Sequence, residues 1–207
     1  MTRKISFLLL LISLFAGGVS RADSNSSRQI LDRAAAVFNG SKSIKAEFST
    51  DVDGTTTAGT ITIQGDKFRI SSKEYSTWYD GKTQWSYSSA ANEVNITEPT
   101  PEELTEINPF VIISSLRKSY NSAKVKSPAG FSKIMLIPKS TSHADIKKAE
   151  ITFNDKTSMP TQVTLEMSAG SRVNIVIKSI VKGNILPAST FIFNKKELPG
   201  AEVIDLR

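Results

Sequence analysis

Few residues of this sequence could perform catalytic chemistry. The 207 residues include one histidine, His143, and no cysteine. Without cysteine the chain can form no disulfide bond and no cysteine-based zinc site. His143 lies in the polar stretch Ser140–Asp145 between two expected strands, so we expect a surface loop residue rather than a base or a ligand. We expect no metal and no cofactor.

Three acidic residues, Glu102, Glu103 and Glu106, are close enough in sequence to be considered as an acid and a base. They follow two prolines at the start of an expected helix, where carboxylates favour the positive end of the helix dipole. We therefore interpret them as residues of a helix start. The sequence also lacks the HExxH, GxSxG, Walker, GxGxxG and EF-hand motifs, so the common hydrolase, nucleotide and calcium signatures are missing. We predict no catalytic residue and a protein that is not an enzyme.

Residues 1–22 resemble a secretory signal peptide. Two basic residues precede an apolar run, Ile5–Ala16, that is too short to span a bilayer comfortably. Small residues then fit cleavage after Ala22, and an uncleaved membrane anchor is the alternative. The prediction is an exported protein with one domain, residues 23–207.

The mature chain would carry a weak positive charge. The sequence has 26 Lys+Arg and 20 Asp+Glu, and loss of Arg3, Lys4 and Arg21 with the signal leaves 23 basic residues and a net charge near +3. No block of like charges is present, so we expect no binding to nucleic acid. An apolar fraction of 39% is typical of a globular domain.

Apolar residues first repeat at helical spacing and then alternate. From Ser26 to Asn39 their spacing predicts an amphipathic helix that ends at Gly40. Alternation, with turn dipeptides such as Asp53-Gly54 and Asp80-Gly81, then predicts strands. The expected strands are residues 44–50, 59–63, 67–70, 77–79, 83–87, 93–97, 131–137, 149–153, 162–167, 172–177 and 189–193.

A second helical run, Asn108 to Arg117, interrupts the strands. Successive strands joined by turns predict a mostly-β (α+β) protein with an antiparallel sheet or barrel. Its apolar residues would form either a filled core or a ligand cavity, because a strongly curved sheet covered by helices can enclose a space. Close packing of protein interiors favours the filled core.

The segment Tyr79–Tyr87, with the sequence YDGKTQWSY, resembles the DGKTLW-x-Y hairpin of the LolA-type periplasmic outer-membrane lipoprotein carriers. Three other segments follow in the family's order. Residues 59–70 are similar to its GxLxxxxPxxFxW strand pair, 108–113 to its P-F-x-x-I helix start, and 133–139 with 146–154 to its F-x-L-x-P-K and I-x-I-x-x strands.

The chain departs from the family pattern at one place. Well-known carriers have an Arg immediately before the Pro of the second strand, which ties their lid shut. Here Ile63–Phe68 contains neither residue. Arg69 follows Phe68, so we expect it on the opposite face of the strand.

The resemblance implies an unclosed antiparallel half-barrel of about ten to eleven strands, with a helical lid over an apolar cavity that holds acyl chains. The lid would be the Pro101–Lys118 insertion with the first helix, and its apolar residues would be Leu104, Ile107, Phe110, Ile113 and Leu116. The cavity wall would include Phe48, Ile61, Ile63, Phe68, Ile70, Trp85, Tyr87, Leu136, Phe153, Leu165 and Ile177. A slip of one residue in register would exchange these for their neighbours.

The resemblance also implies a function, a periplasmic carrier that moves lipoproteins to the outer membrane. Its partners would be acylated lipoprotein cargo, an inner-membrane lipoprotein-releasing transporter complex and an acceptor at the outer membrane, and we expect a monomer. The alternative is a sensor of the same fold that binds lipid or lipoprotein and regulates a protein partner. Such sensors carry a second C-terminal domain, for which this chain is too short. An exported enzyme with an unrecognised carboxylate pair, and a lipid-binding protein without a transfer role, are further hypotheses.

Overall fold

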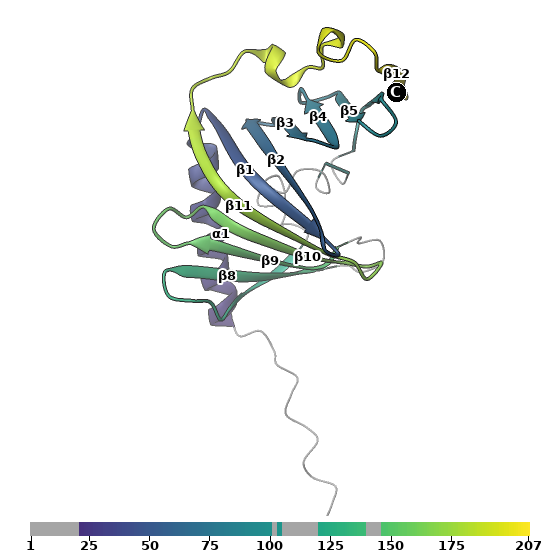
Figure 1. Ribbon diagram of the computed structural model, residues 1–207. Coiled ribbons are helices and arrows are strands. Elements are labelled where there is room, and N and C mark those ends of the chain that lie inside the picture. The colour runs from purple at the N-terminus through teal and green to yellow at the C-terminus, as the bar shows by residue number, and fades with distance from the viewer. Residues whose placement is uncertain (1–20, 101–102, 105–119, 140–145) are drawn as a thin grey trace, which may run out of the picture.

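The computed structural model describes residues 21–100, 103–104, 120–139 and 146–207, in which one long helix packs against a large curved sheet (Figure 1). The helix is α1 (Arg21–Asn39). The first six strands are β1 (Ser43–Val52), β2 (Thr55–Gln64), β3 (Lys67–Ser72), β4 (Tyr75–Tyr79), β5 (Gln84–Ser88) and β6 (Glu93–Thr97). The other six are β7 (Tyr120–Val125), β8 (Phe131–Pro138), β9 (Ile146–Asn154), β10 (Pro160–Met167), β11 (Arg172–Gly183) and β12 (Glu202–Asp205).

The strands form one sheet in the order β12-β6-β5-β4-β3-β2-β1-β11-β10-β9-β8-β7. Neighbouring strands are antiparallel, except that β12 runs parallel to β6. The pairing of β1 with β11 joins two meanders, β1–β6 and β7–β11. Within the part of the chain that the structure describes, β12 and β7 each pair with one neighbour, so the sheet is not closed. Strand β6 lies next to the end strand β12, and β7 is the end strand on the other side, so β6 and β7 are consecutive in the chain but far apart in the sheet.

Turn chemistry fixes the register of the strands. Asp53 and Gly54 have φ values of 49° and 90° and form the two-residue loop between β1 and β2, as Asp-Gly pairs do in hairpins. In the β4–β5 hairpin the Asp80 carboxylate accepts hydrogen bonds from the backbone N–H groups of Lys82 (2.9 Å) and Thr83 (2.8 Å). Both predicted turns are confirmed.

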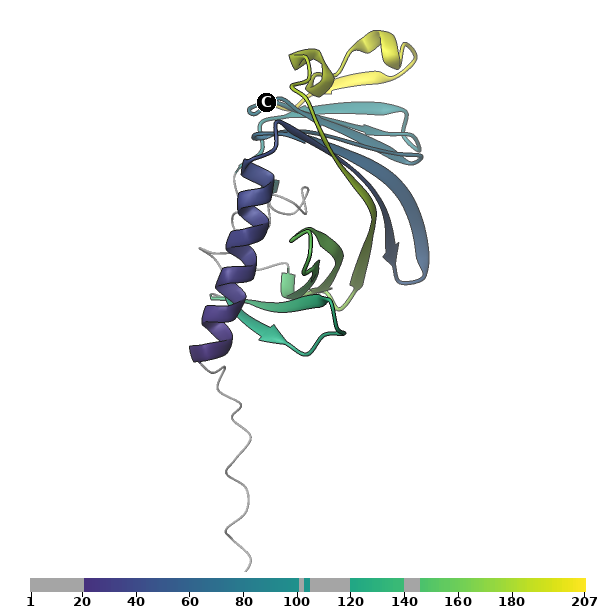
Figure 2. The same ribbon diagram turned by 90° about the vertical axis from the view of Figure 1, so that its left-hand side faces the viewer.

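Helix α1 covers the concave side of the sheet, as Figure 2 shows. Its residues Ile30, Leu31 and Ala34 are buried in the same apolar cluster as residues of both meanders. At the β7 edge the Ser27 hydroxyl lies 3.2 Å from the Ser122 carbonyl oxygen, to which it donates a hydrogen bond. The predicted amphipathic helix is confirmed, and its apolar stripe faces the sheet.

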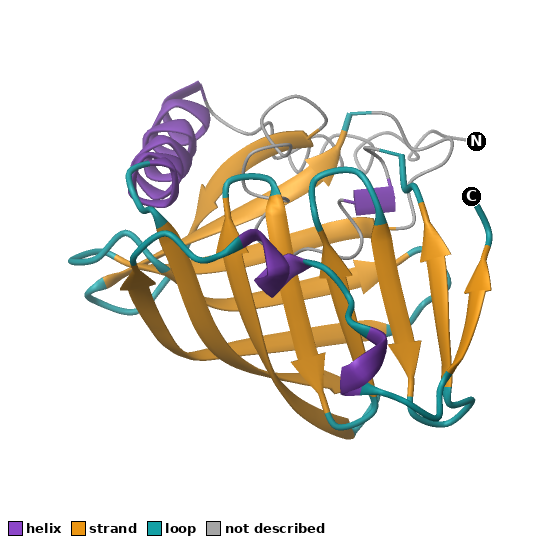
Figure 3. Ribbon diagram, turned by 90° about the horizontal axis from the view of Figure 1, so that it is seen from above, coloured by secondary structure: helices purple, strands orange, loops and turns teal. Residues whose placement is uncertain are grey.

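The chain after β11 crosses the opposite, convex side of the sheet. We call residues 184–205 the C-terminal strap. It contains two short 3-10 helices, η1 (Ala188–Phe191) and η2 (Lys195–Glu197), and ends in β12. Figure 3 shows it running across the strands.

Directional contacts hold the strap in place. Gln64 donates through Nε2 to the Leu186 carbonyl oxygen (3.2 Å) and accepts from the Leu186 N–H through Oε1 (2.7 Å). Near the other end, the Asn92 amide donates to the Gly200 carbonyl oxygen at 2.9 Å. Phe191 of the strap is fully buried. The convex side of β3–β6 therefore has an apolar core of its own.

The prediction of a strand at residues 189–193 is wrong. This segment contains η1 and lies flat on the sheet, because each of the strands β3–β5 beneath it already pairs with two neighbours. Strands β7 and β12 were not expected from the sequence. The first is rich in small and polar residues, and the second has four residues, so neither shows a clear alternation. His143 and most of the expected lid lie outside the described residues.

Candidate functional site: the concave face of the sheet

The concave face of the first meander is lined by large apolar side chains. Cross-strand pairing places Ile61 opposite Ile70 and Ile63 opposite Phe68. Phe48 pairs with Gly59, where a Cβ atom would lie 2.7 Å from the Phe48 ring. The glycine therefore leaves room for this aromatic ring to lie across the neighbouring strand.

The second meander continues the same surface. Leu136, Phe153 and Leu165 are buried in the same cluster, and half-buried Ile177 pairs with Phe48 across the β1–β11 junction. We call this continuous surface the apolar wall. It brings together nine of the eleven residues expected to line a cavity, namely Phe48, Ile61, Ile63, Phe68, Ile70, Leu136, Phe153, Leu165 and Ile177. Other members are Tyr79, Ile134, Ala149, Ile151, Val163 and Ile175.

Tyr79 is the most polar member of the apolar wall. Its ring centroid lies 5.2 Å from that of Phe68. Burial raises the pKa of the Tyr79 hydroxyl, and the nearby carboxylates of Asp66 and Asp80 raise it further. The phenol therefore stays neutral at physiological pH, as an apolar surface requires.

Trp85 and Tyr87 lie on the convex side, which corrects their expected place in the wall. The four-residue loop after Tyr79 places Gln84 opposite Tyr79, so Trp85 pairs with Trp78. Trp78 packs against Phe193 of the strap at 5.4 Å between ring centroids. Large aromatic residues occupy both faces of this hairpin because the strap provides a second core, so size alone did not reveal which phase points inward.

Polar residues replace the apolar wall at its β5–β6 end. The register that carries Ile70 and Tyr79 on the concave face also places there Thr77, Gln84, Ser86, Asn95 and Thr97. We call these five residues the polar rim. The polar rim was not predicted from the sequence. Residues 84–88 and 93–97 alternate between polar and larger apolar or aromatic side chains, and the position of the Asp80-Gly81 turn sets which of them face the concave side.

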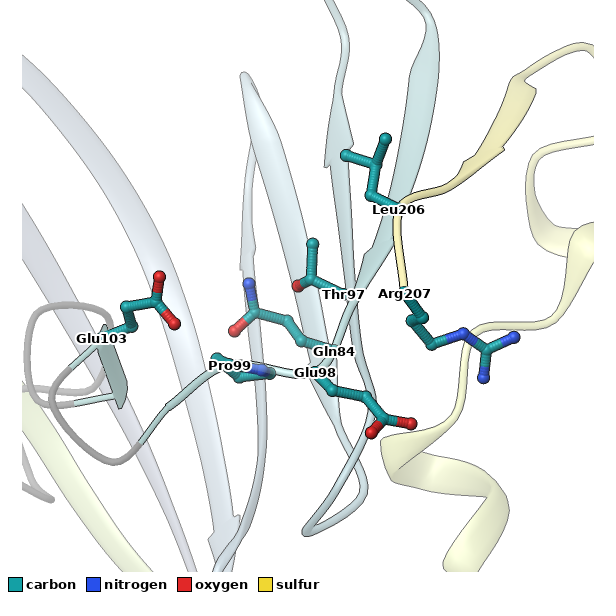
Figure 4. A pocket seen from close by; sticks show the side chains of 7 residues that line it. All are labelled: Gln84, Thr97, Glu98, Pro99, Glu103, Leu206 and Arg207. Atoms are coloured by element: carbon teal, nitrogen blue, oxygen red, sulfur yellow. The ribbon is translucent and has the colours of Figure 1, made fainter.

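A pocket of about 510 Å³ opens beside the polar rim (Figure 4). It is lined by Gln84, Thr97, Glu98, Pro99, Glu103, Leu206 and Arg207. The Glu98 carboxylate forms an ion pair with Lys82 at 3.1 Å. Arg207 donates to both carboxylate oxygens of Asp205, at 2.9 and 2.6 Å. These charges are therefore neutralised in pairs.

The start of the expected lid is partly described. The Glu103 N–H donates to Thr100 Oγ1 (3.3 Å), and the Thr100 N–H donates to Glu103 Oε2 (2.7 Å). This reciprocal capping box marks a helix start, which confirms the interpretation of Glu103 as a helix-start acid. Leu104 packs against the core cluster. The other expected lid residues, Ile107, Phe110, Ile113 and Leu116, lie outside the described residues.

Arg69 points to the convex side, as its position after Phe68 predicted. Its guanidinium lies 5.0 Å from the centre of the Trp78 ring and 2.9 Å from the Glu197 carboxylate of the strap. Arg69 therefore fastens the strap rather than a cover of the concave face.

Among the described residues, no three His, Asp or Glu side chains are grouped so as to hold a metal ion. Within the same residues, no helix has the length and apolar character needed to cross a membrane.

Comparison with known proteins gives the family. Residues 14–171 match the family model described as outer membrane lipoprotein carrier protein LolA. The chain belongs to the LolA family. LolA-like proteins bind lipids or lipoproteins and are periplasmic or extracytoplasmic, and their fold is a binding and carrier fold that is not typically enzymatic. No curated protein sequence matches the chain.

Two solved structures share the fold of this chain at low sequence identity, and a third is similar to it with a lower score. An uncharacterised conserved protein from Thermus thermophilus is 14% identical, with a TM-score of 0.60 over 87% of this chain and 99% of that chain. A DUF1329 family protein from Desulfovibrio piger is 11% identical, with a TM-score of 0.52 over 85% and 99%. A putative outer membrane lipoprotein-sorting protein domain from Vibrio parahaemolyticus is 11% identical, with a TM-score of 0.48 over 85% and 99%.

Proposed function

We propose that this chain is a periplasmic carrier that receives acylated lipoproteins released from the inner membrane and delivers them to the outer membrane. The observation that carries the proposal is the apolar wall, which extends over both meanders on the concave face of a LolA family member. Its partners are the lipoprotein cargo, an inner-membrane lipoprotein-releasing transporter complex and an acceptor at the outer membrane. The carrier acts as a monomer.

The energetics of acyl chains require such a surface. Each buried CH₂ group contributes about 0.8 kcal/mol to membrane anchoring, so a lipoprotein leaves a membrane only for comparable burial elsewhere. A wall of Ile, Leu and Phe side chains supplies it. Apolar contacts are non-directional, so acyl chains can replace the contacts that cover the wall in the empty protein.

The cover in this proposal is α1 together with the Pro101–Lys118 insertion. Two observations support it: Leu104 packs against the core cluster, and the strands on either side of the insertion, β6 and β7, lie near opposite ends of the sheet. Because Arg69 is engaged on the convex side, the insertion would be held by apolar contacts of Ile107, Phe110, Ile113 and Leu116.

Two adjacent residues of β11 give a matched test. Ile177 pairs with Phe48 on the concave face, whereas Val176 is exposed on the convex face. We expect Ile177→Gln to weaken binding of a synthetic triacylated lipopeptide about tenfold, because a polar amide would face its acyl chains, and Val176→Gln to leave it unchanged. Displacement of a fluorescent acyl probe measures both. Phe110→Glu, in the same assay, tests the insertion.

Native mass spectrometry of the periplasmic protein measures bound cargo directly, and it also measures cleavage after Ala22. Transfer is then assayed from inner-membrane vesicles that contain lipoprotein and its releasing machinery. Equal binding by both β11 variants would contradict the assigned wall. Binding of lipopeptide without transfer would overturn the carrier proposal and leave a lipid-binding or sensor protein. If the native mass were that of the protein alone, and the protein took up no lipopeptide, the apolar wall would be part of a filled core.

A further inference from the structure

We propose that the polar rim binds the polar head of the acylated ligand, with Gln84 Oε1 accepting a hydrogen bond from a backbone amide N–H at the acylated end of a lipoprotein. This inference rests on the proposed function, since it assigns the head of the same ligand whose chains the apolar wall would hold.

Gln84 has an unused hydrogen-bonding group in a buried place. Its side chain is 8% exposed, and Nε2 donates to Ser86 Oγ at 2.9 Å. Oε1 is buried and has no hydrogen-bond partner among the residues that the structure describes. A buried acceptor without a donor costs free energy, which a donor from a ligand would recover. If the side-chain amide of Gln84 were rotated by half a turn, Nε2 rather than Oε1 would be the atom without a hydrogen-bond partner. The charges near Gln84 therefore decide whether a ligand that donates or one that accepts a hydrogen bond fits.

Those charges favour a ligand that donates. Glu98 and Glu103 both line the pocket, and Figure 4 shows Glu103 on the side toward which the Gln84 amide extends, whereas Glu98 extends toward Arg207. The cations near them are engaged, Lys82 with Glu98 and Arg207 with Asp205. Figure 4 shows the Arg207 side chain extending away from Gln84. A phosphate bound here would be repelled by the Glu103 carboxylate, and among the described residues that line the pocket no unpaired cation would offset the repulsion. An amide N–H would instead meet hydrogen-bond acceptors.

The position of Gln84 fits the junction between chain and head. It pairs directly with Tyr79, a member of the apolar wall, and on its other side with Thr97 of the rim. An acyl chain along the wall would therefore end where the polar groups begin. An amide-linked acyl chain presents its first N–H group at that point.

Two ligands that differ in one N–H group test the proposal. They are the methyl ester of N-hexadecanoyl alanine and the methyl ester of O-hexadecanoyl lactic acid, in which an ester oxygen replaces the amide nitrogen. We expect the mature protein to bind the amide about tenfold more tightly than the ester, because only the amide satisfies Gln84 Oε1. The preference should vanish in Gln84→Leu and persist in Gln84→Glu, which keeps an acceptor.

Gln162→Leu is the matched control, because Gln162 is an exposed glutamine on β10, and it should keep the full preference. Circular dichroism and thermal unfolding show whether each variant is folded, and Gln84→Glu serves if Gln84→Leu is not. Equal affinity of the natural sequence for amide and ester would overturn the inference while the proposed function stands. If phosphatidylethanolamine bound more tightly than the amide, and this binding depended on Gln84, the polar rim would be assigned to a phospholipid head instead of a lipoprotein amide. Absence of any acyl binding would remove both proposals.

Discussion

The two faces of the sheet are covered in different ways. On the convex side the strap is held by directional contacts, such as the paired hydrogen bonds between Gln64 and Leu186 and the contact of Arg69 with Glu197 and Trp78. On the concave side α1 covers the apolar wall with Ile30, Leu31 and Ala34, and it is hydrogen-bonded to the sheet by Ser27 at the β7 edge.

The difference indicates which cover could be exchanged. Hydrogen bonds and ion pairs need a specific partner at a specific angle, so an acyl chain cannot replace them. Apolar contacts accept any apolar partner of suitable size. We therefore expect substitutions on the convex side to change stability alone, and substitutions on the concave side to change binding as well.

The largest effect should come from Trp78→Ala on the convex side. Trp78 is 2% exposed and packs against Phe193, and loss of a buried aromatic side chain costs about 3–5 kcal/mol. Urea denaturation measures this loss in the free energy of unfolding. Below the unfolding transition, affinity for an acylated ligand should be unchanged.

Trp85→Ala is the control for that substitution. Trp85 lies opposite Trp78 on the same face and is half-buried, so its loss should destabilise the protein less. If Trp78→Ala weakened ligand binding as much as Ile177→Gln, the two faces would not be independent.

A smaller effect is expected from Gly59→Ala on the concave side. The new Cβ atom would lie 2.7 Å from the Phe48 ring and 2.9 Å from the Ser71 carbonyl oxygen, and overpacking of this kind costs about 1–3 kcal/mol. Because Phe48 belongs to the apolar wall, ligand affinity should fall as well. Denaturation and the acyl-probe assay measure the two effects.

Gly200→Ala is the matched control, since nothing lies within 4 Å of the Cβ position at Gly200. Its effect should stay within about 0.5 kcal/mol. The double variant Phe48→Leu/Gly59→Ala should lose less stability than the sum of the single variants, because the smaller side chain relieves part of the clash. Strict additivity would mean that the Phe48 ring is not the obstacle.

The smallest effect is a pH dependence at the end of the strap. Hydrogen bonds from Arg207 lower the pKa of Asp205 to about 2 from its ordinary value of 3.8. A carboxyl group with a lowered pKa stabilises the folded protein above its unfolded pKa, and that contribution is lost as pH falls from about 4 to about 2. The carboxyl carbon of Asp205, followed by NMR, should titrate near pH 2.

Arg207→Gln should move that titration back toward the ordinary value. Ligand binding by the apolar wall should not follow this titration, because the wall has no carboxylate of its own. A midpoint near 4 in the natural sequence would contradict the pairing of Asp205 with Arg207.

The sequence predicted the elements whose pattern is local and left out those that depend on distant partners. Helix α1 and ten strands follow from apolar periodicity and from turns such as Asp53-Gly54. Strand β12 could not be found in this way, because its four residues are strands only where β6 offers an edge. Trp85 was predicted on the wrong face for a related reason. Its large apolar side chain suits the core between the sheet and the strap, and the sequence does not show where the strap packs.

The pairing of β1 with β11 also has a consequence for folding kinetics. Ser43 lies opposite Gly183, so the central junction of the sheet joins residues separated by most of the chain. Contacts between such distant residues slow folding, because a long loop must close before they form. During synthesis, the two meanders cannot join until β11, which ends at Gly183, has emerged. The half-barrel therefore assembles late, after most of the polypeptide has been made.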